Sequence, residues 1–343
     1  MRVAILGCGH ISEQHVRTLK NIHGIELVGV CDLDRHHAKS LAERHQIPGI
    51  YDDVEGMLTG CYPDVVHILT PPQSHRPLVI QVLEAGCNVL VEKPFAENAQ
   101  DAIEIIRVEK QQSASVSVCH NFLYIPAMQK ALGIIKKGAL GRIVSAEVYW
   151  RVSSLETDNR PDAHGWIETL PGGIFHEVGP HVVYLLRAIL GDLVVTSASY
   201  AGEGAVKDEL RVQFRSGDQL AALTISGIEM PIQKYIRIFG TRMSLHVDLG
   251  TNVLVRLRSW GKSIPARALF NLDHAVQLAT GTTGNVVRVL VGGMPHSHTR
   301  FIRAYYQNLR NGKPPPVSCE DGVAVTHILD QIWATTERTS NAS

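Results

Sequence analysis

A glycine-rich turn close to the start of this 343-residue chain is the first segment whose spacing suggests chemistry. Residues 7–12 read Gly-Cys-Gly-His-Ile-Ser, directly after the apolar run Val3–Leu6. In this G-x-G-x-x-S pattern the first glycine allows a tight turn. The second lets the backbone approach a pyrophosphate, whose charge is met by amides at the start of the next helix. The turn therefore predicts dinucleotide binding, with contacts from Gly7, Gly9, His10 and Ile11.

An acidic residue at the end of the second apolar run supports this interpretation. Asp32 follows Ile25–Cys31 and lies twenty residues beyond Ser12. Its carboxylate is placed to accept hydrogen bonds from the adenosine ribose, and it would repel a 2′-phosphate. We therefore expect NAD rather than NADP, although Arg35 is a competing signal because a guanidinium binds phosphate.

Several histidines raise the alternative of a metal site. His176 and His181 lie five residues apart, whereas the zincin pattern places two histidines four apart on one helical face. The pairs His36–His37 and His296–His298 lack a further ligand nearby, so we expect them at the surface. We predict no metal site. Neither a G-x-S-x-G elbow nor a Walker loop occurs, which leaves triad hydrolysis and P-loop phosphoryl transfer without support.

The elements that must position these residues follow from apolar spacing in the first 120 residues. The predicted strands are Val3–Leu6, Ile25–Cys31, Val65–Leu69, Asn88–Val91 and Ser115–Cys119. The predicted helices, with apolar residues at three- and four-residue spacing, are Ser12–Asn21, Asp34–His45, Ser74–Ala85 and Ala99–Gln111. Non-alternating strands joined by helices predict an α/β fold, a doubly wound parallel Rossmann sheet in a dinucleotide-binding domain over residues 1–120.

The pattern changes after residue 120 and predicts a second domain of α+β type over residues 121–343. The expected helices are Ala127–Lys137 and His181–Leu190, separated by a strand at Arg142–Tyr149 and an irregular stretch at Arg151–Pro171. Further strands are expected at Val194–Tyr200, Glu209–Phe214, Gln219–Ser226, Lys234–Phe239 and Ser244–Val247. Consecutive strands with tight turns indicate a largely antiparallel sheet. For residues 264–293 we expect a helix and a loop that pack on the core or on another subunit.

Composition excludes some classes of partner. Lys plus Arg and Asp plus Glu each number 33, so the formal net charge is zero and a nucleic-acid partner is not expected. No apolar run is long enough for a membrane span, and the N-terminus has no signal-peptide pattern. The six cysteines are scattered without a C-x-x-C pair. We therefore expect reduced, mostly buried thiols in a cytoplasmic protein.

Two further segments give the chain a family resemblance. The first runs from Thr-Pro-Pro-Gln-Ser-His at 70–75 to Glu-Lys-Pro at 92–94, and the second is Gly-Gly-Ile-Phe-His-Glu-Val-Gly-Pro-His at 172–181. With the N-terminal glycines and the ending at 316–322, they resemble the Gfo/Idh/MocA oxidoreductases. The resemblance implies a Rossmann domain, a C-terminal domain whose open sheet carries the substrate, and a homo-oligomer, either a dimer or a tetramer.

The resemblance also implies site residues. Lys93 corresponds to the lysine that contacts the reacting hydroxyl, and Glu177 and His181 correspond to the acidic residue and the histidine of the later motif. The expected catalytic residues are Lys93, His181 and Glu177. Further cofactor contacts are expected from Thr70, Pro71, Pro72, His75, Glu92 and Lys93. The expected substrate residues are Lys93, Asn121, Tyr124, Arg160, Glu177 and His181.

The chain departs from the family pattern at three positions. Pro171 stands where the family has a glycine, Phe122 where an arginine is common, and Glu177 where the family has aspartate. The glutamate lengthens the carboxylate arm by one methylene group. This change affects the expected role of Glu177 and the position of the substrate more than it affects the chemistry.

These residue types suit hydride transfer from an alcohol. A histidine has a suitable pKa for proton transfer near neutrality, so we expect His181 to be the general acid/base. A cationic Lys93 would stabilise alkoxide-like charge and orient the hydroxyl. The reverse assignment, with Lys93 as acid/base and His181 only binding, stays open.

The predicted function is NAD-dependent oxidation or reduction at a hydroxyl-bearing carbon of a sugar, nucleotide sugar or cyclitol. Two alternatives remain at this point. One is a glycosidase that uses tightly bound NAD as a transient redox relay. The other is a non-catalytic NAD-binding scaffold, which the departures at Pro171 and Phe122 motivate.

Overall fold

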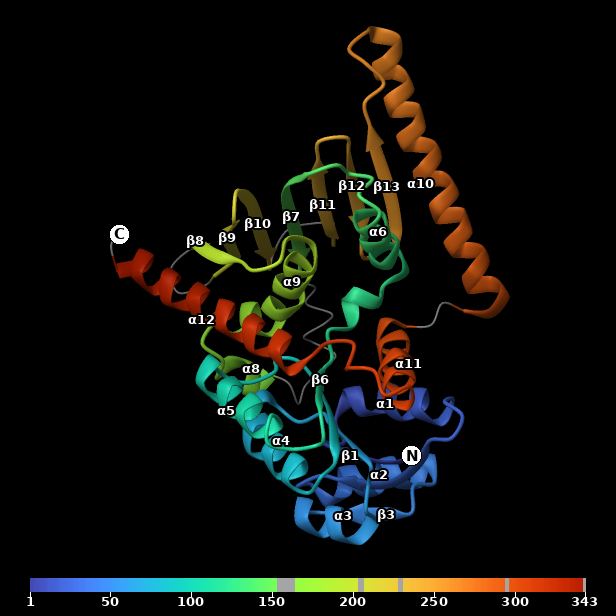
Figure 1. Cartoon of the computed structure of the whole chain (residues 1–343), viewed down its shortest axis with the longest axis vertical. Coiled ribbons are helices and arrows are strands. Elements are labelled where there is room, and N and C mark those ends of the chain that lie inside the picture. The colour runs from blue at the N-terminus through green and yellow to red at the C-terminus, as the bar shows by residue number, and fades with distance from the viewer. Residues whose placement is uncertain (153–163, 203–206, 228–230, 294–295, 342–343) are drawn as a thin grey trace. The chain divides into compact units, whose positions relative to one another are not determined.

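The computed structural model describes residues 1–152, 164–202, 207–227, 231–293 and 296–341. The chain forms two compact units (Figure 1). The first unit comprises Met1–Asn121, Arg160–Pro180 and His298–Asp330, and the second comprises Phe122–Asn159, His181–Ser297 and Gln331–Ser343. The first unit thus includes two segments from later in the chain. The single domain boundary expected after residue 120 stays a prediction.

The first unit contains a six-stranded parallel sheet, which confirms the predicted Rossmann-type architecture. Its strand order is β3-β2-β1-β4-β5-β6, and every printed pairing is parallel. The strands are β1 (Arg2–Leu6), β2 (Glu26–Cys31), β3 (Gly49–Tyr51), β4 (Val65–Ile68), β5 (Asn88–Val91) and β6 (Val116–Val118). Nearly all residues of β1, β4 and β5 are buried, as expected for strands covered on both faces.

Helices connect these strands. They are α1 (His10–Lys20), α2 (Arg35–His45), α3 (Val54–Cys61), α4 (His75–Glu84) and α5 (Ala99–Glu109), with a 3-10 turn η1 (Pro72–Ser74) before α4. The pair β3 and α3 was not predicted, because β3 has only three residues and α3 contains two glycines, which weaken a helical pattern. The Asp53 side chain caps α3 by accepting a hydrogen bond from the Gly56 amide at 2.6 Å.

The second unit contains a seven-stranded sheet in the order β13-β12-β11-β7-β10-β9-β8 (Figure 1). Its strands are β7 (Ile143–Arg151), β8 (Val194–Ala201), β9 (Glu209–Ser216), β10 (Gln219–Ser226), β11 (Lys234–Gly240), β12 (Met243–Asp248) and β13 (Val253–Arg258). All printed pairings are antiparallel except β10 with β7, so the predicted largely antiparallel sheet is confirmed. Strand β13 was not predicted.

The helix expected over His181–Leu190 is α9, which spans Ile174–Leu190, so the expected start at His181 is wrong. The helix begins seven residues earlier, and Pro180 lies inside it. A proline inside a helix removes one backbone hydrogen bond, so such a helix needs support from packing. That support is present, because every residue from Phe175 to Leu186 is buried. A short helix α8 (His164–Glu168) also interrupts the stretch expected to be irregular.

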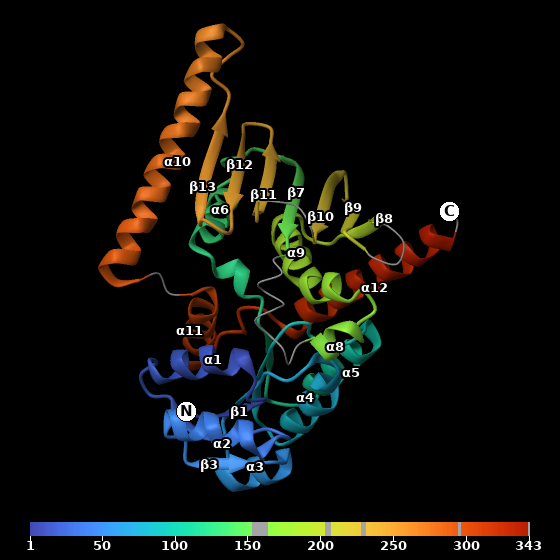
Figure 2. The ribbon, with the colours of Figure 1, turned by 180° about the vertical axis from the view of Figure 1, so that it is seen from behind.

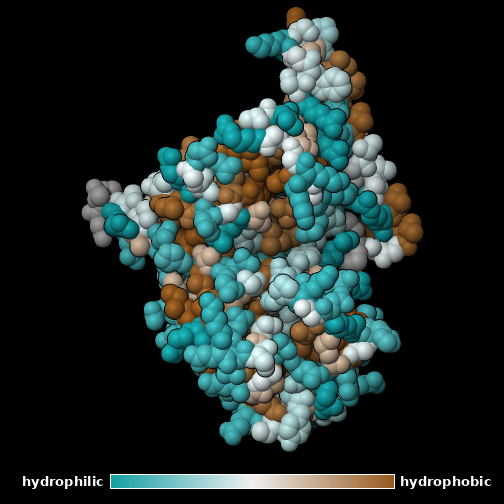
Figure 3. All heavy atoms as spheres, in the orientation of Figure 1, coloured by the Kyte–Doolittle hydropathy of each residue, from teal (hydrophilic) through white to brown (hydrophobic). Residues whose placement is uncertain are grey.

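The segment expected to be a helix and a loop is one long helix, α10 (Ile264–Gly292). The Ser263 side chain caps the first turn of α10. Helix α10 packs on β13, and helix α6 (Pro126–Lys136) packs on β12 and β13 (Figures 1 and 2). Much of α10 is apolar and exposed, and Figure 3 shows hydrophobic residues along its outer edge. Among the described helices, none is both long and apolar enough to cross a membrane.

The remaining elements are a 3-10 turn η2 (Asn121–Tyr124) and two C-terminal helices, α11 (Ser297–Arg310) and α12 (Cys319–Asn341). Both C-terminal helices were missed by the sequence interpretation. All but the first residue of α11 belong to the first unit, where Phe301, Ile302, Tyr305 and Tyr306 are buried. The first unit therefore takes part of its core from a segment that is remote in sequence from the Rossmann strands.

Candidate active site

The glycine turn has the geometry that a dinucleotide requires. Gly7 has a φ of +95°, and an added Cβ would lie 2.8 Å from the Leu69 carbonyl carbon, so only glycine fits there. At Gly9, the N-cap of α1, an added Cβ would meet nothing within 4 Å. No side chain caps the first amides of α1, which leaves them available to an anion. The Ser12 hydroxyl closes the turn by donating to the Gly9 carbonyl at 2.6 Å.

Asp32 lies beside this turn at the end of β2. Its carboxylate accepts hydrogen bonds from the amides of Cys8 at 2.7 Å and Asp34 at 2.9 Å. Arg35 was the residue that could favour NADP by binding its 2′-phosphate. Its guanidinium instead donates to the Asp52 carboxylate at 2.9 Å, which weakens the case for NADP. The turn, α1 and Asp32 together fit a dinucleotide with an unphosphorylated ribose.

His75 connects the Thr-Pro-Pro loop to the Glu-Lys-Pro segment. Its ring is buried, with Nε2 2.8 Å from the Thr70 carbonyl oxygen and Nδ1 2.9 Å from the Pro94 carbonyl oxygen. Burial lowers the pKa of His75, although the three backbone carbonyls around it oppose that change. Pro71 is exposed and Pro72 is buried in η1. His75 thus holds the loop against the segment that carries the expected catalytic lysine.

Lys93 forms an ion pair with Glu177. The Lys93 ammonium donates to the Glu177 carboxylate and also to the Glu177 backbone carbonyl at 3.2 Å. The two side chains are only 11% and 10% exposed. This is therefore a largely desolvated pair rather than a surface one. The structure brings together two of the three residues that the sequence interpretation named as catalytic.

His176 is a neighbour of this pair that the sequence interpretation assigned no role. It is buried, and burial, followed by the positive charge of Lys93, lowers its pKa to about 4. The imidazole is therefore neutral at physiological pH. A neutral histidine beside the lysine adds no second positive charge to the site.

His181 lies one helical turn after Glu177 on α9, in the second unit, so the two residues share one face of the helix. Its ring stacks on Trp150 at 5.5 Å and meets Phe122 edge-on at 4.6 Å between centroids. His181 Nδ1 lies 2.9 Å from the Tyr184 hydroxyl, which also accepts the Phe122 amide at 3.0 Å. Aromatic packing and the contact with the Tyr184 hydroxyl thus help to orient this imidazole.

The other predicted substrate residues have different environments. Asn121 is buried, and its amide nitrogen lies 3.1 Å from Nδ1 of His298. Tyr124 is half-buried in η2, and burial raises its pKa. Arg160 lies outside the described residues. Because Lys93 belongs to the first unit and His181 to the second, their convergence on one substrate stays a prediction.

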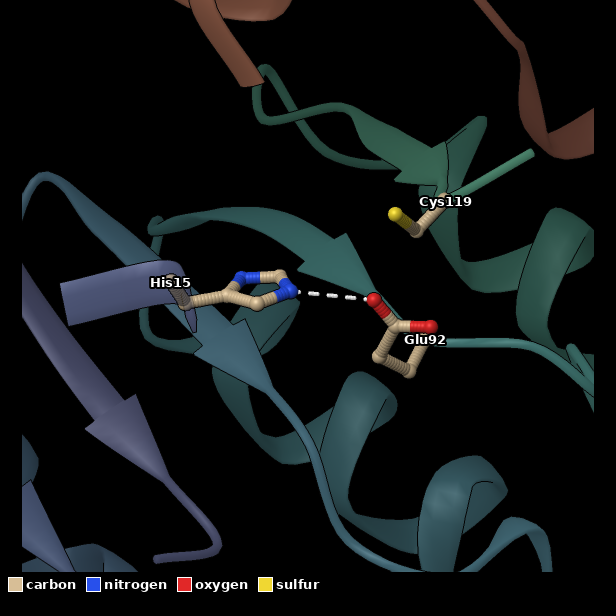
Figure 4. A group of neighbouring side chains, drawn as sticks. All are labelled: His15, Glu92 and Cys119. Atoms are coloured by element: carbon tan, nitrogen blue, oxygen red, sulfur yellow. Dashed lines mark hydrogen bonds and ion pairs between the residues drawn. The ribbon is translucent and has the colours of Figure 1, made fainter. Parts of the chain in front are cut away.

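A buried polar group surrounds Glu92, which was expected to contact the cofactor. Its Oε1 lies 3.0 Å from Nε2 of His15, and the Cys119 thiol is the third member of the group (Figure 4). His298 Nε2 lies 3.7 Å from Glu92 Oε1, and its side chain is only 13% exposed. The expectation that His298 is a surface residue is therefore wrong. The signal that could have revealed this group is His67 within the apolar run of β4, because a buried imidazole requires polar partners.

Among the described residues, His15, Glu92 and Cys119 are the one group whose donor atoms lie close enough to hold a metal ion. In the structure the His15–Glu92 hydrogen bond already uses two of these atoms. Burial, followed by the charge of Glu92, raises the pKa of the Cys119 thiol well above its usual value, which disfavours the thiolate that a metal requires. The absence of a metal site stays a prediction.

Comparisons with known proteins agree with this fold and site. Residues 1–120 match the model of an oxidoreductase family with an NAD-binding Rossmann fold, and residues 128–246 match the GFO/IDH/MocA C-terminal domain. D-apiose dehydrogenase from Paraburkholderia graminis is 28% identical over 196 residues, which cover 57% of this chain and 51% of that protein. D-glucoside 3-dehydrogenase from Escherichia coli (strain K12) is 28% identical over 205 residues, which cover 58% and 56%. The chain thus matches about half the length of these curated relatives.

One solved structure superposes on nearly the whole of this chain. The WlbA dehydrogenase from Bordetella pertussis, in complex with NADH and UDP-GlcNAcA, superposes with a TM-score of 0.80 at 19% identity, covering 99% of this chain and 96% of that one. At this identity the likeness concerns the fold. The two family models carry the assignment: this chain belongs to the Gfo/Idh/MocA oxidoreductases, whose N-terminal domain is an NAD-binding Rossmann fold.

Proposed function

We propose that this protein is an NAD-dependent dehydrogenase that transfers a hydride between the nicotinamide and a hydroxyl-bearing carbon of a sugar, nucleotide sugar or cyclitol. The observation that carries the proposal is the desolvated Lys93–Glu177 pair. It lies at the carboxyl end of β5, where open α/β sheets bind their ligands. The named relatives act on sugars, which supports the same substrate class here.

The residues have distinct roles in this proposal. Bound NAD supplies the hydride acceptor. Glu177 pairs with the Lys93 ammonium, and the ammonium stabilises negative charge on the substrate oxygen. His181, one helical turn after Glu177, takes the hydroxyl proton as the carbonyl forms. Asn121 and Tyr124 orient the remaining hydroxyl groups of the substrate, and Arg160 binds a carboxylate or phosphate if the substrate carries one.

The test is a screen of sugars, inositols and nucleotide sugars, read as NADH absorbance. Replacing Lys93 with methionine should lower kcat by about a hundredfold or more, as loss of one charge-stabilising donor does. Replacing the exposed Lys137 with methionine is the matched control and should leave kcat unchanged. Unchanged turnover in the Lys93 variant contradicts the proposal. Turnover of a substrate without net formation of NADH would favour the alternative of a glycosidase that uses NAD as a redox relay. NAD binding without any turnover would favour the alternative of a non-catalytic NAD-binding scaffold.

The preference for NAD over NADP is part of the proposal and has its own test. It rests on the Asp32 carboxylate beside the glycine turn and on the engagement of Arg35 by Asp52. Asp32→Ala should raise the ratio of kcat/KM for NADP to that for NAD by about tenfold, because a repulsive charge is removed. An unchanged ratio contradicts the assigned role of Asp32.

We further propose that the protein is a homo-oligomer in the cytoplasm. Exposed apolar residues on α10, among them Leu272 and Leu290, favour a subunit contact. Native mass spectrometry should show a dimer or tetramer, and a monomer at micromolar concentration would contradict this. All six cysteines are free, and five of them are buried, which suits a reducing compartment.

A further inference from the structure

Four side chains from separate elements of the first unit form one continuous hydrogen-bonded chain. The Tyr306 hydroxyl, on α11, lies 2.8 Å from Nε2 of His67, on β4. Nδ1 of His67 lies 2.9 Å from Nδ1 of His15, on α1. Nε2 of His15 lies 3.0 Å from Oε1 of Glu92, the link drawn in Figure 4. Tyr306, His67 and His15 are all 0% exposed, so solvent does not compete for these bonds.

The carboxylate of Glu92 determines which atom donates and which accepts in each hydrogen bond of this chain. An ionised carboxylate only accepts, so Nε2 of His15 carries the hydrogen. If His15 is neutral, its bare Nδ1 can only accept, so Nδ1 of His67 is the donor. Nε2 of His67 is left to accept from the Tyr306 hydroxyl. The three hydrogen bonds therefore all point the same way, from Tyr306 towards Glu92.

The charges at the Glu92 end favour this resting state. Burial opposes ionisation of Glu92, but the hydrogen bond from His15 and the nearby His298 outweigh it and hold the pKa of Glu92 well below its usual range. Cys119 and the Lys93 amide, which is 3.3 Å from Oε2, are the other polar groups that face this carboxylate. The chain thus ends on a stable negative charge.

The surroundings of His67 and Tyr306 keep both of these groups neutral. Burial, followed by the proximity of His15, holds the pKa of His67 well below its usual value, and Glu92 opposes this only in part. Burial and the neighbouring Tyr305 raise the pKa of Tyr306 well above its usual value, with Arg310 acting in the opposite direction. An extra proton on His67 or on Tyr306 would therefore be held for only a short time in transit.

The Tyr306 end of the chain meets a surface pocket of about 440 Å³. The pocket is lined by Asn21, Ile22, His23, Arg303, Tyr306, Gln307, Arg310 and Asn311. Tyr306 is the one member of the chain that lines this pocket, and its side chain is covered in the structure, so protons would enter there when the pocket wall opens briefly.

We propose that Tyr306, His67 and His15 form a proton relay between this pocket and Glu92, the residue that precedes Lys93. A proton from the pocket binds the Tyr306 oxygen as Tyr306 passes its own proton to Nε2 of His67. His67 passes its Nδ1 proton to Nδ1 of His15, and His15 passes its Nε2 proton to Glu92. One proton enters, Glu92 becomes neutral, and every hydrogen bond in the chain reverses direction. The reverse sequence returns one proton to the pocket.

The purpose of the relay rests on the proposed dehydrogenase function. Oxidation of an alcohol by NAD releases one proton for each hydride transferred. Each proton that the relay carries changes the charge on Glu92, the residue next to Lys93, by one unit. A nearby charge alters how readily an amine or an imidazole exchanges a proton. The relay therefore couples protonation in the active site to solvent. Tyr306, His67 and His15 are positioning residues in this scheme, since none is placed against the substrate.

Tyr305 and Tyr306 provide a matched pair of variants. Both rings are buried, they meet edge to face at 5.2 Å, and only Tyr306 donates into the chain. Nitrogen-15 NMR of the intact protein without substrate should show His15 protonated at Nε2 and His67 at Nδ1. Tyr306→Phe should slow solvent exchange of the His15 ring proton by about tenfold or more, and Tyr305→Phe should not. Equal exchange in wild type and Tyr306→Phe, or a His67 proton on Nε2 at rest, overturns the relay.

The link to catalysis has a separate readout. Tyr306→Phe and His67→Gln should each lower kcat by about tenfold, less than loss of a direct acid/base, with KM unchanged and an altered solvent isotope effect. Tyr305→Phe should match wild type. If the wild-type protein turns over no substrate, the proposed function fails while the exchange measurement still decides the relay. If both relay variants keep the wild-type kcat and isotope effect, the coupling to catalysis is wrong.

Discussion

The Lys93–Glu177 pair allows a quantitative test of the site. Glu177→Gln keeps the shape of the side chain but removes its charge, leaving the Lys93 ammonium unpaired in a site where both side chains are about nine-tenths buried. An exposed pair would contribute at most about 1 kcal/mol. Breaking a buried pair by removing one partner costs about 3–5 kcal/mol, because the remaining charge stays desolvated. The amide oxygen of glutamine still accepts from the ammonium, so we expect the lower end, about 3 kcal/mol.

Urea unfolding of the single and double variants measures this coupling. Lys93→Met should also be destabilising, since it removes the ammonium that pairs with the Glu177 carboxylate. The double variant should be more stable than the sum of the two losses predicts. The interaction energy should be about 2 kcal/mol or more. Strictly additive losses, or a loss below about 0.5 kcal/mol, would refute the view of this pair as desolvated.

Three further predictions concern the turn and the neighbouring histidine. Gly7→Ala should destabilise the first unit by about 2 kcal/mol or more in thermal unfolding, because alanine is strained in this left-handed backbone conformation. The φ of Gly7 is +95°, and its added Cβ would lie 2.8 Å from Leu69. Gly9→Ala should leave the unfolding transition unchanged and weaken NAD binding in calorimetry, because its Cβ meets nothing within 4 Å of protein. The folded-state pKa of His176 is about 4, below the unfolded value, so the unfolded chain binds the extra proton. Stability should therefore fall by up to about 3 kcal/mol between pH 7 and pH 4, and His176→Gln should lack this part of the slope in urea titrations.

The parts of the fold that could be predicted are those with strong local patterns. The five predicted strands of the first sheet lie in mostly apolar runs, and the glycine turn between β1 and α1 has a specific spacing. Strand β3 was missed because its two apolar residues, Ile50 and Tyr51, lie between Pro48-Gly49 and Asp52-Asp53, which break the apolar pattern. Helix α9 was predicted to start too late because a proline is more common in the first turn of a helix than in its interior. In α9 burial on all sides compensates for the proline, and such packing is not visible in a local window.

The candidate site was predictable only where short motifs carry its residues. Lys93 and Glu177 lie in two such motifs, and the structure pairs them. The buried group around Glu92 was not predicted, because its members come from α1, β4, the end of β6 and α11 and share no sequence pattern. His298, for example, looks like one of two surface histidines until α11 places it near Glu92. Residues that meet only through tertiary structure leave no spacing to detect.

The parallel pairing in the second sheet has a consequence for how that unit is made. Strand β7 lies between β10 and β11, and its residue Trp150 pairs with Ile225 of β10. Neither neighbour has been synthesised when β7 leaves the ribosome, so this central strand must wait for distant segments, and such non-local pairing slows folding. A chain that ends before Gln219 leaves both edges of β7 open to pairing with other chains. Truncated forms of this protein are therefore expected to aggregate, even when they include every strand of the Rossmann sheet.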